Sequence, residues 1–317
     1  MKSPWYAVSL LAGGLFFAST APAQTASGAL LQQMEQASQS LNYELAYINV
    51  SRLGIESLRY RHAVIDNTVY AQLLQMDGPR REVLQRGDDI SYFEPGLEPF
   101  TLNGGHIVDS LPSLVYADFQ RLSASYDFVP VGRTRVADQL CEVIRIVARD
   151  GTRYSYVVWL DSETRLPLRV DLLDRDGETL EQYRVVSFAV DEGVRNLLEG
   201  LRKAKLPPSL SVPASKPVNF SWKAGWLPAG MSEVSQSRRT IPSLDKPVES
   251  RLFSDGLFSV SINISAADRN SRTQVLRTGR RTVQTVVRNN VEITVVGEVP
   301  PVTARRIADA VNLGASR

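Results

Sequence analysis

Cysteine and histidine are almost absent from this chain, which has one cysteine, Cys141, and two histidines, His62 and His106, among 317 residues. A single cysteine cannot form an internal disulfide or a cysteine-cluster metal site, and two histidines supply few further metal ligands. The chain also lacks the glycine-rich nucleotide loops, the G-x-S-x-G nucleophile motif and the H-E-x-x-H zinc motif. Most metal, thiol and nucleotide chemistry is therefore disfavoured, and we expect no cofactor.

The remaining polar candidates for catalysis lack the neighbours that they need. His106 follows two glycines in a loop where nothing nearby in sequence orients it. Asp88 and Asp89 are adjacent, so in a strand they point to opposite faces. Residues 174–177 resemble part of a calcium loop but lack its final bidentate glutamate, and they fit a hairpin turn. We therefore expect a protein that is not an enzyme, with a glycan hydrolase as the remaining enzymatic alternative.

The first 23 residues are typical of a secretory signal peptide. Lys2 precedes a short apolar stretch, residues 7–18, and an Ala21-x-Ala23 site follows. The apolar stretch is too short to span a bilayer core of about 30 Å as a helix, which disfavours the alternative of an uncleaved membrane anchor. We expect cleavage before Gln24 and a soluble mature protein in the periplasm.

A proline-rich linker, residues 206–217, divides the mature chain into two domains of opposite charge. Residues 24–205 hold 20 Lys or Arg and 26 Asp or Glu, a net charge of −6, whereas residues 218–317 hold 14 and 8, a net charge of +6. The basic domain suits an anionic partner such as a partner segment, a phosphorylated lipid headgroup or the acidic domain of a second copy in a homodimer. The alternative is two solvated surfaces without a partner. The total of 36 basic and 34 acidic residues does not indicate nucleic-acid binding.

The acidic domain is predicted to form one helix followed by many antiparallel strands. Leu30, Met34, Ala37 and Leu41 have helical spacing. Alternating apolar residues predict strands at 43–47, 58–64, 69–76, 153–161, 166–174 and 179–190. Asp-Gly pairs predict hairpin turns, and a short helix is expected at residues 194–203. Because a long flat sheet exposes its edges, this sheet is expected to curl or close.

The basic domain is predicted to be a smaller α+β unit. Hairpins are expected around Ser254-Asp-Gly256 and around Asn289-Asn290. A helix over residues 302–313 follows two prolines and is expected to end at Gly314.

The strands predicted at residues 153–161 and 166–174 are unusually apolar, and few helices accompany so many strands. The concave side of a curved sheet therefore keeps an apolar groove for a lipid chain or a partner peptide. The alternative for each residue is an ordinary core position. The residues expected to line the groove are Tyr116, Phe119, Tyr154, Tyr156, Trp159, Leu168 and Leu172.

Five stretches resemble the MucB/RseB family of envelope-stress regulators. They are residues 154–169, 171–182, 222–230, 254–259 and 295–307, and the last three are specific to the family. The resemblance covers nearly all of the mature chain, and it is close enough to suggest the Pseudomonas member of the family itself.

This resemblance implies an N-terminal open half-barrel similar to lipoprotein carriers of the periplasm and a smaller C-terminal α+β domain. It implies binding to the periplasmic part of a transmembrane anti-sigma factor, which is MucA in Pseudomonas. Binding shields the anti-sigma factor from regulated proteolysis and keeps an extracytoplasmic-function sigma factor inactive, which restrains alginate production in Pseudomonas. Lipopolysaccharide or another lipid is expected to bind the regulator and loosen the complex.

Two further sets of residues are expected to serve this mechanism. Arg280, Arg281 and Arg288 are candidates for an anionic lipid headgroup, with solvated arginines as the alternative. Trp222, Trp226 and Phe258 are candidate anchors for the partner, with core positions as the alternative.

A periplasmic lipid or lipoprotein carrier is the alternative function. This function accounts for the half-barrel and the signal peptide, but it assigns no function to the basic domain. Deletion of residues 218–317 separates the two functions, because a carrier keeps lipid transfer whereas a regulator loses control of its partner.

Overall fold

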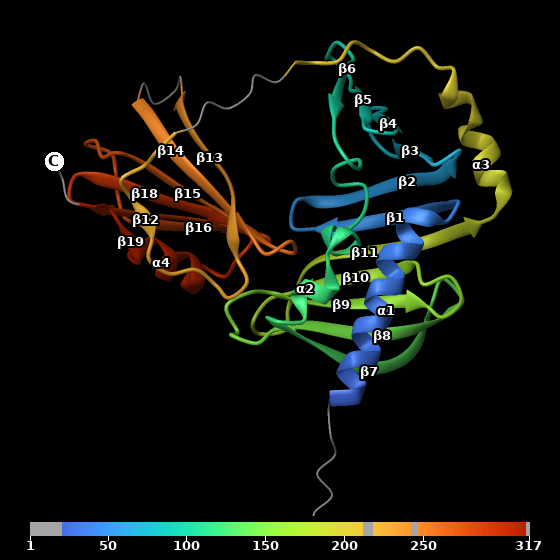
Figure 1. Cartoon of the computed structure of the whole chain (residues 1–317), viewed down its shortest axis with the longest axis horizontal. Helices are drawn as coiled ribbons and strands as arrows, with labels where there is room; N and C mark the ends of the chain where they lie inside the picture. The colour runs from blue at the N-terminus through green and yellow to red at the C-terminus, as the bar shows by residue number, and fades with distance from the viewer. Residues whose placement is uncertain (1–20, 212–217, 242–245, 315–317) are drawn as a thin grey trace, which may run out of the picture.

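The computed structural model describes residues 21–211, 218–241 and 246–314, which form two large antiparallel sheets and one short pair of strands (Figure 1). The strands of the larger sheet are β1 (Tyr43–Ser51), β2 (Gly54–Ile65), β3 (Thr68–Gln75), β4 (Glu82–Arg86), β5 (Asp89–Phe93), β6 (Phe100–Asn103), β7 (Tyr126–Val136), β8 (Gln139–Ala148), β9 (Ser155–Asp161), β10 (Pro167–Leu173) and β11 (Thr179–Val190). Their order is β6-β5-β4-β3-β2-β1-β11-β10-β9-β8-β7, so the sheet curves without closing into a barrel. This confirms the predicted open, mostly antiparallel architecture.

The smaller sheet has six strands in the order β13-β14-β15-β18-β17-β16. These strands are β13 (Ser232–Ile241), β14 (Lys246–Ser254), β15 (Ser259–Ala266), β16 (Gln274–Thr278), β17 (Arg281–Arg288) and β18 (Val291–Gly297). A separate pair is formed by β12 (Lys223–Ala224) and β19 (Val311–Asn312). Between β17 and β18, Asn289 and Asn290 both have positive φ, 52° and 64°, which confirms the predicted hairpin turn.

One long helix and several short ones cover parts of both sheets. They are α1 (Ala21–Ser40), η1 (Ser113–Tyr116), α2 (Phe119–Leu122), α3 (Glu192–Leu198), η2 (Glu199–Arg202) and α4 (Pro301–Asp309). Leu31 and Met34 of α1 are fully buried in the core of the larger sheet, together with alternate residues of β1, Tyr43 and Leu45. The period-two pattern of the strands thus places one apolar face against α1, η1 and α2, as alternation along a strand requires.

Two predicted helices differ from the structure at their ends. The helix expected at residues 194–203 begins earlier, because the Asp191 carboxylate accepts a hydrogen bond from Val194 N–H at 3.2 Å, and it becomes a 3₁₀ helix after Leu198. The helix expected at residues 302–313 ends at Asp309, because the chain beyond it pairs with β12. Gly225 makes this pairing close, since a Cβ there would lie 2.2 Å from the Ala310 carbonyl oxygen.

The start of the linker is fixed to the edge strand β6. Thr101 N–H donates to Pro208 O at 3.0 Å, Leu210 N–H donates to Thr101 O at 2.8 Å, and the Thr101 hydroxyl donates to Pro207 O at 2.9 Å. The linker therefore covers an edge of the larger sheet that would otherwise be unpaired. Residues 212–217 of the predicted linker and residues 1–20 of the predicted signal peptide lie outside the described residues.

Candidate functional site

A cavity of about 450 Å³ lies on the core-facing side of the larger sheet. Its floor is made by neighbouring strands, because Val170 pairs with Tyr183 and Leu172 pairs with both Tyr156 and Glu181 in the sheet register. These five residues alternate with outward-facing residues along β9, β10 and β11. The volume lies within the roughly 300–1,000 Å³ of small-molecule sites.

The loop that precedes and includes η1 forms one wall of the cavity. Tyr47 on β1 donates its hydroxyl hydrogen to the Ser110 carbonyl, and the Ser110 hydroxyl donates to Ile107 O at 2.8 Å. The rings of His106 and Tyr116 stack with their centroids 3.8 Å apart. Burial lowers the pKa of His106, so this ring is neutral at pH 7. A hydrogen bond from Tyr47 therefore holds this loop against β1, and the side chain of His106 is uncharged.

An ion triad at the cavity connects the two sheets. Arg280, in the turn between β16 and β17, lies 3.3 Å from a carboxylate oxygen of Glu181 on β11 and 3.2 Å from one of Glu298. Burial raises the pKa of Glu181, and the Arg280 guanidinium partly offsets this. The cavity thus has a cationic group of the smaller sheet at a wall of the larger one.

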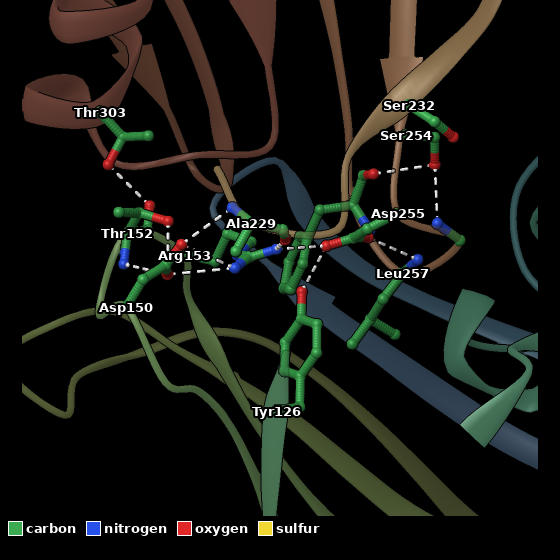
Figure 2. A network of polar contacts seen from close by, with 12 residues as sticks. Tyr126, Asp150, Thr152, Arg153, Ala229, Ser232, Ser254, Asp255, Leu257 and Thr303 are labelled. Carbon is green, nitrogen blue, oxygen red and sulfur yellow. Dashed lines mark hydrogen bonds and ion pairs between the residues drawn. The ribbon is translucent and has the colours of Figure 1, made fainter. Parts of the chain in front are cut away.

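Arg153 forms the centre of the contact between the two sheets (Figure 2). Its side chain is fully buried, with 0% exposure, and Nη1 lies 2.7 Å from the Asp255 carboxylate, which is 2% exposed. Nη1 also donates to Ala229 O at 2.7 Å, and Nη2 donates to both carboxylate oxygens of Asp150 at 3.0 Å. Arg153 therefore links two carboxylates that come from different sheets.

Asp255 uses its second oxygen to shape the turn between β14 and β15. Oδ1 accepts hydrogen bonds from Leu257 N–H at 2.9 Å and Phe258 N–H at 2.8 Å, while Oδ2 accepts one from the Tyr126 hydroxyl at 2.6 Å. The turn is consequently held in one conformation and directed toward β7 and β9 of the larger sheet (Figure 2). We call the contacts made by Tyr126, Arg153, Asp255 and Phe258 the domain seam.

Phe258 brings the smaller sheet into the core of the larger one. Its side chain is 1% exposed and belongs to the same hydrophobic cluster as Tyr43 and Leu45. The Phe258 ring stacks on Tyr156 with centroids 5.4 Å apart, and Tyr156 lines the cavity. The cavity and the domain seam therefore share a side chain.

Protonation of Asp150 is expected to weaken the contact between the sheets. Burial alone raises the pKa of this carboxyl, but hydrogen bonds from Thr152 and from Ala229 N–H, together with the charge of Arg153, hold it below its usual value. A group with a lowered folded-state pKa adds stability above its unfolded pKa of about 3.9, and this stability is lost as the pH falls through the folded value. We expect Asp150→Asn to lower the free energy of unfolding by about 1 kcal/mol at pH 7.

The measurement is thermal unfolding of wild type and Asp150→Asn at pH 7 and at pH 3. The difference in Tm between the two proteins should shrink as the pH falls through the folded pKa of Asp150. A difference that stays constant between these pH values contradicts this account.

The structure brings only some of the predicted groove residues to the cavity. Tyr116, Tyr156 and Leu172 line it. Phe119 and Leu168 are buried in the core instead, because α2 and β10 pack them against neighbouring strands. These two side chains are not accessible to a ligand.

Two further groove candidates have other partners. Tyr154 is buried, and its hydroxyl donates to Val299 O at 3.2 Å, which makes it a contact between the sheets. Trp159 points to the opposite face of β9, where Arg169 lies over its ring at 4.3 Å. Alternation along β9 accounts for the placement of Trp159, since its neighbours Val158 and Leu160 face the core.

The three arginines that were candidates for binding a lipid headgroup lie in different surroundings. Arg280 lines the cavity, whereas Arg281 is exposed outside it. Arg288 donates to Asp309 O at 3.0 Å and to Val311 O, so it satisfies one carbonyl at the C-terminal end of α4 and one just beyond it. Only Arg280 of these three is placed to meet a ligand in the cavity.

The three candidate partner anchors lie in different surroundings. Trp222 is 2% exposed in the core of the smaller sheet, and its indole N–H donates to Glu249 at 2.8 Å. Trp226 is half-buried and carries Arg306 over its ring at 3.8 Å. Phe258 is occupied in the domain seam. Trp226 is therefore the member of the set with surface available to a partner in this arrangement.

Sequence reasoning missed Arg153, Asp255 and Tyr183. Arg153 stands beside an Asp-Gly turn, and Asp255 stands within one, so both resembled ordinary turn residues. Their pairing joins positions 102 residues apart, for which a single sequence contains no local signal. The period-two pattern of β11 could have identified Tyr183 as a core-facing residue.

Within the described ranges, no group of three or more His, Cys, Asp or Glu residues is arranged to hold a metal ion. Among those same residues, no helix is both long enough and apolar enough to cross a membrane.

Comparison with known proteins identifies relatives over the whole chain. Family models match as the MucB/RseB N-terminal domain over residues 26–210 and the MucB/RseB C-terminal domain over residues 216–312. The sigma-E factor regulatory protein RseB of Escherichia coli (strain K12) is 64% identical over 318 residues, with 100% of both chains covered. The sigma factor AlgU regulatory protein MucB of Pseudomonas aeruginosa is 27% identical over 308 residues, with 94% of both chains covered. The expected family is confirmed, whereas an identity of 27% does not support the expectation that the chain is the Pseudomonas member itself.

A solved structure supports the same relationship. The crystal structure of MucB in complex with MucA(peri) matches with a TM-score of 0.70 at 25% identity, covering 92% of this chain and 100% of that one. The two family models together span both sheets and the contact between them, and the identity to the RseB proteins extends from end to end. This chain therefore belongs to the MucB/RseB family.

Proposed function

We propose that this chain is a periplasmic negative regulator of a sigma-E-type sigma factor. It binds the periplasmic part of a transmembrane anti-sigma factor, shields that segment from proteolysis, and releases it when a lipid occupies the cavity. The observation that carries the proposal is that Tyr156 and Arg280 belong both to the cavity and to contacts between the sheets. The class of partner follows from the relative MucB, which was crystallised with MucA(peri).

An acyl chain in the cavity gains enough free energy to change the arrangement of the domains. Each buried CH₂ group contributes about 0.8 kcal/mol, so a few groups exceed a typical coupling free energy of about 1–3 kcal/mol between two sites. Coupling also requires that the lipid bind the free and the partner-bound forms of the protein with different affinity. A lipid that binds both forms equally well does not change the affinity for the partner.

Arg280 supplies a physical reason for such a difference. It joins Glu181 of the larger sheet to Glu298 of the smaller one, at 3.3 and 3.2 Å. An anionic headgroup at the cavity competes with Glu181 for this guanidinium and adds repulsion to a carboxylate whose pKa burial already raises. Binding of an anionic lipid thus weakens an ion pair that holds the sheets together.

Titration of the complex with lipid tests the proposed function. We expect a saturating anionic acyl lipid to lower the affinity of the full chain for the periplasmic segment of its anti-sigma factor by about 5–150-fold. By reciprocity, the partner segment should lower the affinity for lipid by the same factor. Protection of the segment from a protease should disappear over the same range of lipid concentration.

Arg280→Gln is the matched variant for this titration, because it removes the charge and keeps a shorter, polar side chain. It should bind the partner segment yet show a smaller effect of lipid. If lipid binds and the affinity for the partner does not change, the proposed release of the partner by lipid is ruled out.

A further inference from the structure

The smaller sheet ends in β16, whose outer edge has no partner strand among the described residues. The other three edges of the two large sheets are protected against pairing. The linker pairs with β6, and β7 contains Pro130 with a register shift beside it. β13 also has a register shift, and small polar or charged side chains occupy most of its length. Because these features discourage pairing, β16 is the edge most open to an added strand.

Backbone groups of β16 are directed away from the sheet. A two-residue turn, Gly279-Arg280, joins β16 to β17, and the pair that closes the turn is Thr278 and Arg281. Such a closing pair is hydrogen-bonded, and hydrogen-bonded positions alternate along two antiparallel strands. The N–H and C=O groups of Val275 and Arg277 therefore point outward, where a further strand can bind them.

The side chains in the middle of β16 are apolar and exposed. Val275 and Leu276 are 53% and 64% exposed, and alternation places them on opposite faces of the sheet. Leu276 pairs with Val283, and Val283 pairs with Val296, so an apolar row crosses three strands and stops at the open edge. A strand with an apolar residue beside Leu276 extends this row.

Cationic side chains lie next to this edge. Arg269 and Arg272 are in the segment that leads into β16, and both are exposed. Neither forms an ion pair with a described residue, whereas the neighbouring Asp268 is paired with Lys246 at 3.1 Å. A second copy of the chain presents the same cationic edge, so like charges oppose pairing between two copies. The edge suits an extended segment that carries both apolar and acidic side chains.

A second cavity connects this edge to the larger sheet. Its volume is about 740 Å³, and Arg277 and Gly279 line it from the end of β16, together with residues of the larger sheet. Val50, Ser51 and Gln182 line both this cavity and the cavity of about 450 Å³ assigned to lipid. A segment that continues beyond this end of β16 enters a space bounded by both domains and separated from the lipid by shared residues.

We propose that the periplasmic segment of the anti-sigma factor binds as an added β-strand on β16, with apolar residues beside Leu276 and acidic residues beside Arg269 and Arg272. The inference rests on the proposed function and names the surface that serves it. In this mode of recognition main-chain hydrogen bonds supply affinity, and alternate side chains supply specificity. Proteolysis concentrates in exposed, poorly ordered chain, so a segment held in a sheet is also shielded.

Proline at an outward-facing position tests the pairing. Val275→Pro removes one N–H donor and leaves a carbonyl of the partner unpaired, so the affinity for a soluble periplasmic segment of the anti-sigma factor should fall at least about twenty-fold. Val275→Ala keeps the N–H and should weaken binding by at most about five-fold. Both variants should keep the Tm of wild type, since an edge strand tolerates proline where its N–H faces solvent. A marked decrease in Tm for Val275→Pro shows that the free protein uses this N–H, and the proposal then fails.

Reversal of one charge tests the choice of an acidic partner. Arg272→Glu should weaken binding of the segment, and the loss should shrink at high salt because screening reduces interactions between exposed charges. Arg239→Glu is the matched control, since Arg239 is exposed on β13 at the opposite edge of the same sheet. It should leave the affinity unchanged. Equal losses for the two variants contradict the assignment to β16.

Hydrogen exchange of the full chain with and without the segment locates the added strand. Binding should slow exchange at the amides of Val275 and Arg277 and leave β13 unchanged. Protection of β13 in place of β16, wild-type affinity in Val275→Pro, or a dimer of the free chain that Val275→Pro abolishes overturns this inference and leaves the proposed function standing. A wild-type chain that does not bind the segment overturns the proposed function, and the inference with it.

Discussion

Replacing Arg153 with methionine is expected to lower the free energy of unfolding by about 3–5 kcal/mol, because breaking a buried ion pair leaves an uncompensated charge. The charge left behind is the Asp255 carboxylate, which is 2% exposed and receives its cationic partner from the other sheet. Ala229 O loses its hydrogen bond at the same time. Calorimetry should show a large decrease in Tm, and limited proteolysis should show faster cleavage between the two domains.

Arg149 offers a matched control for this experiment. Its pair with Asp127 is 2.8 Å long, but both side chains are 45% exposed. Arg149→Met should therefore cost less than about 1 kcal/mol. In the Arg153→Met background, Asp255→Asn removes the stranded charge and should restore part of the stability. Equal losses for Arg153→Met and Arg149→Met contradict the assigned role of burial.

Replacing Phe258 with alanine is the second change with a large expected effect. Truncation of a buried phenylalanine costs about 3–5 kcal/mol through lost apolar contact and the cavity that remains. Here the lost contacts join two domains, since Phe258 of the smaller sheet packs on Tyr156 of the larger. We expect the single unfolding transition to separate into two and the radius of gyration from X-ray scattering to increase.

Phe253 is the control that separates docking from stability. It is 4% exposed and lies in the core of the smaller sheet rather than in the domain seam. Phe253→Ala should destabilise the smaller domain to a similar extent while the radius of gyration of the folded protein stays unchanged. Phe258→Leu, which retains most of the volume, should keep the domains together. An unchanged radius of gyration for Phe258→Ala is inconsistent with its role in docking.

Much of the fold follows from short-range patterns in the sequence. Alternating apolar residues and turn pairs predicted the strand at residues 179–190, which matches β11 at both ends, and the hairpin at Asn289-Asn290. The strand follows from the alternation of apolar and polar residues, and the turn follows from a backbone conformation with positive φ that few residues adopt. Both signals lie within a few neighbouring residues of the sequence. The predicted C-terminal end of α4 was wrong, because the residues after Asp309 pair with the distant strand β12.

The candidate site was less predictable because it depends on contacts between distant segments. Phe258 was expected to anchor a partner protein, because aromatic residues are enriched at interfaces. The sequence around it does not show that it packs instead against the larger domain of the same chain. Arg153 and Asp255 were not distinguished from turn residues for the same reason. By contrast, Tyr156 and Leu172 were expected at a groove because they lie on apolar strands, and Tyr116 because it lies in a bulky apolar segment upstream of them. All three line the cavity.

The pairing of the linker with β6 limits how far the two domains can separate when the seam opens. The backbone is held on the sheet as far as Leu210, and Phe220 packs against the core of the smaller sheet, so the covalent connection between these two residues reaches at most roughly 35 Å. A tether this short keeps the separated domain at a local concentration in the millimolar range. Re-association of the two domains is then an intramolecular event that does not depend on the concentration of the protein.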